Sequence, residues 1–194
     1  MSPLKKIFGA LCMFICTTGM SGMLPMLFGK RGIGAGTISS ILTTVVLIEL
    51  YDQQLHFLVI LGLVVISLIV GTVATKYGEQ FILEHWGPGK RHTGETVEHD
   101  LNEANIDEVH GMLVAVLPIY FIARPFEQFI VLHIIALVMF RIFDVLKPGP
   151  IKWVEDNVGK WLGEPAAVML DDTAAGLASA CLVYFAGRYI QLFL

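Results

Sequence analysis

The sequence predicts an all-α, polytopic membrane protein with about five to six transmembrane or re-entrant helices. Hydrophobic residues make up 55% of the chain and charged residues only 15%, whereas soluble domains are about 25% charged. The mean hydropathy is +0.70. The segment Leu55–Thr75 carries no formal charge and is long enough to cross about 30 Å of hydrocarbon as a helix. We therefore expect a single integral membrane domain over residues 1–194, with no basic block that would bind nucleic acid.

The first apolar segment is Ile7–Phe28, and it is expected either to span the membrane or to enter it and return. Gly19, Gly22 and Pro25 interrupt its second half, which favours a break in the helix. A pair of lysines precedes the segment, as in a secretory signal, but no small-residue cleavage site follows. We expect the segment to be retained.

Further apolar helices are expected at Thr37–Leu50, Met112–Ile122, Glu127–Leu146 and Ala166–Leu194. Thr37, Ser39 and Ser40 are candidate N-caps of the first of these, because a hydroxyl oxygen can accept a hydrogen bond from an unpaired amide at a helix start.

Two polar connectors separate these helices. The longer is 76–107, within which Gln80–Trp86 is expected to form a short interfacial helix, since tryptophan favours the headgroup level. The other is Ile151–Leu162, which is expected to be amphipathic.

The distribution of basic residues predicts the orientation. If every apolar segment spans, nine Lys and Arg residues fall in segments 28–37, 76–110 and 141–165, and four fall on the other side. Loops rich in Lys and Arg stay in the cytoplasm. We therefore expect a polar site at the cytoplasmic face.

Two pairs of adjacent carboxylates begin apolar segments, Asp107 with Glu108 and Asp171 with Asp172. An ionisable residue at the centre of a membrane helix costs about 2.5 to 3.5 kcal/mol on insertion scales, so such residues indicate function. Carboxylate oxygens suit Mg²⁺, and His110 follows the first pair closely. The competing interpretation is that these acids lie at helix N-termini, where the helix dipole stabilises negative charge.

A second polar group ends the Glu127–Leu146 segment. Arg141, Asp144 and Lys147 are spaced three residues apart, which places them along one side of a helix end, and Pro148 then stops the helix. Two cations beside carboxylates suggest a pocket for a metal and a phosphate. The alternative is a membrane helix that ends in interfacial charges.

The glycine-rich turn from Gly29 to Thr37 leads into a helix N-terminus, where backbone amides can cradle a phosphate. It lacks the residue order of a nucleotide-binding P-loop. A flexible turn between two membrane helices is the alternative.

These polar segments resemble the signature stretches of the phosphatidylglycerophosphatase A family. The resemblance rests on FRIFDVLKPGPI at Phe140–Ile151, DDTAAG at Asp171–Gly176 and DEVHG at Asp107–Gly111. Gly36 and Thr37 lie where the family has P-G-T-x-G-S. The match covers the chain from about residue 29 to its end.

The chain also departs from the family pattern. Ala35 replaces a proline, Ser39 replaces a glycine, Ala167 stands where a glycine is usual, and the connector before Asp171 is longer. The charged residues are unaffected.

The resemblance implies a membrane-bound phosphoric monoester hydrolase that converts phosphatidylglycerophosphate to phosphatidylglycerol and phosphate with Mg²⁺. The resemblance also implies a multi-pass protein of the bacterial inner (plasma) membrane, with its active site facing the cytoplasm. A homo-oligomer is compatible with the sequence.

We assign the roles as hypotheses on this basis. The expected metal ligands are Asp107, Glu108, Asp171 and Asp172, and the expected catalytic residues are Asp144, Asp171 and Asp172. Asp144 would orient Arg141 or join the metal. Phosphorus would be attacked either by a water activated by the metal or by the carboxylate of Asp171 or Asp172. The expected substrate-binding residues are Arg141, Lys147, Gly36 and Thr37.

Two other functions compete with this hypothesis. A small transporter or cation-coupled carrier would use intramembrane carboxylates to bind a cation, but it needs a site near the middle of the membrane, whereas the charges here are predicted on one side. A non-catalytic assembly subunit is the second alternative.

Overall fold

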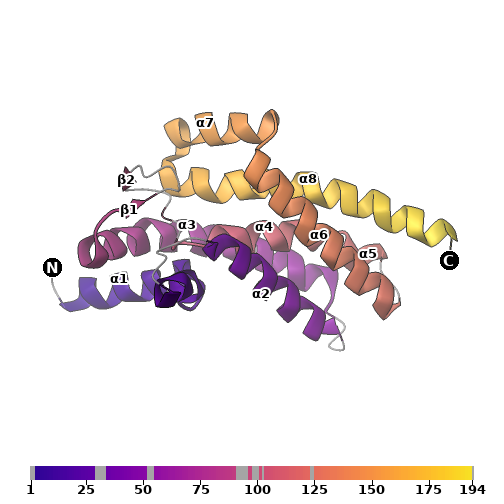
Figure 1. The fold of residues 1–194 in the computed structure, drawn as a ribbon, viewed down its shortest axis with the longest axis horizontal. Coiled ribbons are helices and arrows are strands. Elements are labelled where there is room, and N and C mark those ends of the chain that lie inside the picture. Colours follow the sequence, from indigo (N-terminus) through magenta and orange to yellow (C-terminus); the bar gives the residue numbers. More distant parts are fainter. Residues whose placement is uncertain are drawn as a thin grey trace.

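The computed structural model describes residues 3–28, 34–51, 55–90, 96–97, 101, 103–122 and 125–193. Over these ranges the chain forms a helical bundle with one short antiparallel ribbon (Figure 1). The elements are α1 (Pro3–Cys16), η1 (Ser21–Phe28), α2 (Ala35–Glu49), α3 (Phe57–Trp86), β1 (Gly89–Lys90), β2 (Thr96–Val97), α4 (Ile106–Val116), α5 (Ile119–Ile122), α6 (Phe126–Leu146), α7 (Pro150–Leu162) and α8 (Glu164–Phe193).

The helical membrane class predicted from composition is confirmed. Three helices in the described part of the chain are long and apolar enough to cross a membrane, namely α3, α6 and residues 164–191 of α8. The helix α2 is apolar but shorter.

The first apolar segment is not one helix. The helix α1 ends at Cys16, and Thr18, Gly19 and Met20 all adopt positive φ angles of 47°, 63° and 71° before the 3-10 helix η1 begins. A continuous spanning helix over Ile7–Phe28 is therefore wrong, and the break falls at the first of the glycines that the sequence singled out.

The expected interfacial helix at Gln80–Trp86 is also wrong as a separate element. The helix α3 continues through it to Trp86, since no residue between Thr75 and Trp86 stops a helix. The carboxylate of Glu79, on this extension, accepts a hydrogen bond from the Leu101 amide at 2.7 Å. This hydrogen bond stabilises the buried carboxylate of Glu79 within the long helix.

The helix α2 starts without the side-chain N-caps that we expected. It begins at Ala35, after Gly34 in a left-handed conformation, and no side chain caps it. The hydroxyls of Ser39 and Ser40 instead donate to the carbonyl of Gly36, each at 2.9 Å.

The centre of the bundle is α4, which contacts α2, α3, α6 and α8 (Figure 1). The expected apolar helix at Met112–Ile122 is divided at Pro118 into α4 and α5. All residues from Met112 to Val116 are buried, and Phe140 of α6 packs in the same core. This segment is therefore apolar because it faces other helices, whereas α3 exposes most of its apolar residues.

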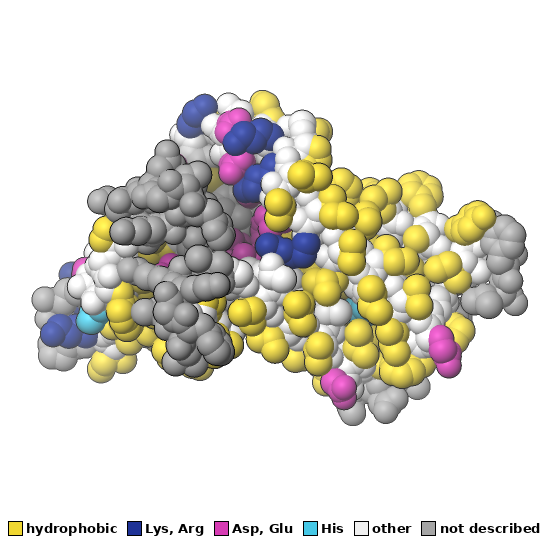
Figure 2. All heavy atoms as spheres, viewed as in Figure 1, with side chains coloured by type: hydrophobic (Ala, Val, Ile, Leu, Met, Phe, Trp, Pro, Cys, Tyr) yellow, Lys and Arg dark blue, Asp and Glu magenta, His cyan; other side chains and the backbone are white. Residues whose placement is uncertain are grey.

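Polar and apolar side chains separate along the length of the molecule. Figure 2 shows hydrophobic side chains over α6 and the C-terminal half of α8, whereas charged side chains gather around α7 and in the hollow beside it. The amphipathic connector is confirmed as α7, which packs along the N-terminal half of α8 and buries Ile151 and Val158.

Candidate active site

Three of the four expected metal ligands converge between α4 and α8. Asp107, Glu108 and Asp172 each offer a carboxylate oxygen, and these oxygens all lie within 4.8 Å of one another. Asp107 and Glu108 lie in the first turn of α4. Asp172 lies well inside α8, which begins at Glu164. A helix N-terminus therefore accounts for the position of the first pair but not for that of Asp172.

Close packing of two glycines brings these helices together. A Cβ atom on Gly176 of α8 would lie 2.5 Å from the carbonyl oxygen of Gly111 in α4. A Cβ atom on Gly111 would lie 2.4 Å from the Phe140 ring and 3.0 Å from the carbonyl oxygen of Asp172. Only glycine allows this approach, and it places the Asp172 backbone against the helix that carries Asp107 and Glu108.

The chemistry of the cluster fits a divalent cation. Glu108 Oε2 and Asp172 Oδ2 are buried and have no hydrogen-bond partner among the described residues. Burial holds the pKa of Glu108 well above its ordinary value; the charges of Asp172 and Asp144 also raise this pKa, while a hydrogen bond with Asp107 and the charge of Arg141 lower it. Clustered, dehydrated carboxylates of this kind are stabilised by a hard cation with oxygen ligands, such as Mg²⁺.

The fourth expected ligand, Asp171, points elsewhere. Its carboxylate forms an ion pair with the ammonium of Lys147, which also donates to Glu155 Oε1 at 3.0 Å. Burial alone would lower the pKa of Lys147, but these two carboxylates raise it above its ordinary value, so the side chain stays cationic. The structure thus places Asp171 beside the phosphate-binding candidate Lys147 and outside the three-carboxylate cluster.

The backbone of Lys147 is unusual. This residue caps α6 in the left-handed conformation, with φ 42° and ψ 59°. Residues other than glycine and asparagine seldom adopt this backbone conformation. The chain reverses here, so the ammonium returns toward α7 and α8.

Arg141 and Asp144 form the second ion pair of the site. Arg141 Nη1 lies 3.0 Å from Asp144 Oδ2, one turn apart on α6. Their side chains are 22% and 16% exposed, so the pair is shielded from solvent yet open to an incoming group. Asp144 thus contacts Arg141, and its role in orienting Arg141 stays a prediction.

The described end of the glycine-rich turn lies against the carboxylate cluster. A Cβ atom on Gly36 would lie 1.8 Å from Glu108 Oε1, so the first turn of α2 lies directly against the carboxylate cluster. Thr37, the next residue, lines a groove with Arg141. The part of the predicted cradle before Gly34 lies outside the described residues.

Two interactions at the site could not be predicted from the sequence. Glu155 resembled a surface acid of an amphipathic helix, and nothing in the sequence indicated its contact with Lys147. The other is a bridge through buried His110, whose ring nitrogens lie 2.8 Å from Ser67 Oγ of α3 and 2.8 Å from Thr173 Oγ1 of α8. The bridge links three helices beside the carboxylates.

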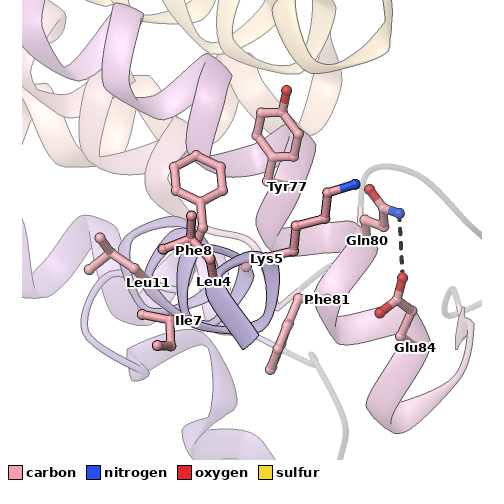
Figure 3. A pocket seen from close by; sticks show the side chains of 10 residues that line it. Leu4, Lys5, Ile7, Phe8, Leu11, Tyr77, Gln80, Phe81 and Glu84 are labelled. Carbon is pink, nitrogen blue, oxygen red and sulfur yellow. Dashed lines mark hydrogen bonds between the residues drawn. The ribbon is translucent and has the colours of Figure 1, made fainter. Parts of the chain in front are cut away.

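A pocket that is larger than the groove lined by Thr37 and Arg141 lies away from the candidate site, between α1 and the C-terminal part of α3. Its volume is about 700 Å³. Figure 3 shows Phe8 and Leu11 lining it with other apolar side chains, while Gln80 Nε2 donates to Glu84 Oε1 at 3.4 Å at its polar side. It contains none of the residues of the candidate site.

Comparisons with known proteins identify the family of this chain. The sequence model of the family described as Phosphatidylglycerophosphatase A matches residues 14–187. The curated protein Phosphatidylglycerophosphatase A of Escherichia coli (strain K12) is 44% identical over 55 residues, which cover 28% of this chain and 30% of that protein. The match thus spans less than a third of that relative's length.

No solved structure matches the chain. The family match extends over most of the chain and includes every residue that we assigned to the site. The chain therefore belongs to the phosphatidylglycerophosphatase A family.

Proposed function

We propose that this protein is a Mg²⁺-dependent phosphoric monoester hydrolase that converts phosphatidylglycerophosphate to phosphatidylglycerol at the cytoplasmic face of the membrane. The observation that carries the proposal is the convergence of Asp107, Glu108 and Asp172 within 4.8 Å, beside two ion pairs that contain Arg141 and Lys147. Family membership and the name of the E. coli relative support the reaction and its substrate.

The cation would be held by Asp107, Glu108 and Asp172, and when bound it would supply Lewis-acid stabilisation of charge on the phosphoryl oxygens. Lys147 stays protonated, so it can bind a phosphate oxygen and offset the charge that develops on the leaving phosphoryl group. Arg141 can bind two phosphate oxygens through its planar guanidinium while Asp144 holds its orientation.

Asp171 has a different role in this proposal. It holds the Lys147 ammonium in place through the ion pair and keeps it charged. The nucleophile would be water or the carboxylate of Asp171 or Asp172; if a carboxylate attacks phosphorus, water would then hydrolyse the acyl phosphate, which releases phosphate and returns the carboxylate.

The proposal predicts metal-dependent phosphate release. Purified protein in detergent or vesicles should release phosphate from phosphatidylglycerophosphate with Mg²⁺, lose this activity in EDTA, and regain it when excess Mg²⁺ is added. Measuring inorganic phosphate over time tests this. Metal binding without phosphate release would contradict the proposal and favour a cation-coupled carrier.

The proposed orientation makes a separate prediction. With the exposed Cys181 replaced by serine, a cysteine at Lys160 on α7 should react with a membrane-impermeant maleimide in inverted vesicles but not in intact cells. Glu127→Cys, at the opposite end of α6, should show the reverse pattern. The same accessibility for both positions, or the opposite assignment, would contradict the orientation.

A further inference from the structure

An apolar groove between α2 and α6 shares two lining residues with the candidate site. Its volume is about 500 Å³. Ile41 of α2 and Val138, Ile142 and Val145 of α6 line it, together with other apolar residues. On α6 these residues recur every three to four positions, so the groove follows the helix axis.

The groove opens toward the surface that faces lipid. Ile41 is 45% exposed, Val138 47% and Val145 69%, and α6 is one of the three helices able to cross the membrane. Figure 2 shows hydrophobic side chains over the α2 and α6 face. The surroundings of the groove are therefore hydrocarbon, and a ligand would enter it laterally from the bilayer.

Two residues assigned to the site line this groove. Thr37 and Arg141 are its two polar lining residues. Arg141 pairs with Asp144, and Thr37 follows Gly36, which touches Glu108. Apart from these two residues the lining is apolar, with Val138 and Val145 on either side of Arg141 along α6. A hydrocarbon chain in the groove would therefore lie against the residue that is proposed to bind the anionic headgroup of the same lipid.

We propose that this groove binds one acyl chain of the lipid substrate and so fixes the phosphate of its headgroup beside Arg141 and Thr37. The proposal rests on the proposed function, and it assigns chain recognition to Ile41 and Val138. The pocket between α1 and α3 also has apolar lining residues, together with Lys5, Gln80 and Glu84 (Figure 3), and it includes none of the site residues, which makes it a control.

Narrowing the groove tests the proposal. Ile41→Trp and Val138→Trp are compared with Leu11→Trp in the control pocket, where Leu11 is 54% exposed. Each full-length variant is assayed with long-chain phosphatidylglycerophosphate and with a short-chain analogue that has the same headgroup. In the groove variants we expect kcat/KM for the long-chain lipid to fall about tenfold or more. For the short-chain analogue, kcat/KM of the same variants should stay within about twofold of the wild-type value. In Leu11→Trp, kcat/KM should be unchanged for both lipids.

A second measurement does not depend on turnover. A long-chain phospholipid with a photoreactive diazirine in one acyl chain should label peptides of α2 and α6 in the wild-type protein, and Val138→Trp should reduce this labelling.

Equal loss of activity on both lipids, or labelling confined to α1 and α3, would overturn the groove proposal. A wild-type protein that is labelled on α2 and α6 but releases no phosphate would instead contradict the proposed function. A groove variant that changes the oligomeric mass would show that a second copy of the chain covers the groove, and it would overturn the proposal as well.

Discussion

Asp172→Asn is expected to lower kcat by about 10²- to 10³-fold, the usual cost of removing one group that stabilises transition-state charge. The carboxylate contributes one oxygen to the cluster with Asp107 and Glu108, and asparagine keeps the shape while removing the charge. Asparagine cannot ionise, so it avoids the cost of burying a charged carboxylate beside two others, and the metal-free variant should be at least as stable as the wild type. Phosphate release and thermal unfolding in detergent measure the two effects.

The same variant should lose the stabilisation by Mg²⁺. A ligand that binds only the folded protein raises stability by about 2.7 kcal/mol at a hundred times its dissociation constant, so wild-type protein should unfold at a higher temperature when Mg²⁺ is added. Asp156→Asn is the matched control, because Asp156 is exposed on α7 and pairs with Lys152 at 3.1 Å. An Asp172→Asn protein with normal activity and a normal Mg²⁺ effect would refute the assignment of Asp172.

Gly176→Ala is expected to destabilise the folded protein by about 1–3 kcal/mol, the usual cost of overpacking a core. The new methyl group would lie 2.5 Å from the Gly111 carbonyl oxygen and 2.9 Å from Val114 Cβ. A backbone carbonyl cannot rotate away as a flexible side chain can, so α4 and α8 must separate. Because that separation moves Asp107 and Glu108 away from Asp172, activity should fall together with the unfolding temperature.

The control for this substitution is Gly62→Ala on α3, where an added Cβ meets no atom within 4 Å. Alanine is favoured over glycine inside a helix by about 1 kcal/mol, so this variant should be unchanged or more stable. If Gly176→Ala also gained stability and kept its activity, the close approach of α4 and α8 would not be what assembles the site.

Much of the fold follows from the apolar segments, because a membrane helix must satisfy its backbone internally and needs a long apolar surface. The segments at 37–50, 127–146 and 166–194 correspond to α2, α6 and α8 within a few residues. The role of α4 could not be predicted in this way. An apolar residue such as Met112 has the same character whether it faces lipid or another helix, and only the packed bundle decides between them.

The sequence indicated the candidate site residues but not their contacts. Asp107 and Glu108 are neighbours on α4, and both offer an oxygen to the three-carboxylate cluster. Asp171 and Asp172 are neighbours on α8, yet Asp172 lies in the cluster and Asp171 pairs with Lys147. Helical spacing does not distinguish these two cases, because the contacts of each carboxylate depend on how α4, α6, α7 and α8 are arranged. The roles of these residues stay predictions.

The left-handed conformation of Lys147 has a consequence for protein engineering. Holding a residue with a side chain in this region costs roughly 1–2 kcal/mol, so a redesign guided by backbone conformation alone would place glycine at position 147. That change would leave the mostly buried carboxylate of Asp171 without its ammonium partner, and removing one partner of a buried ion pair costs about 3–5 kcal/mol. Libraries selected for thermostability should therefore keep lysine at this position despite its backbone conformation.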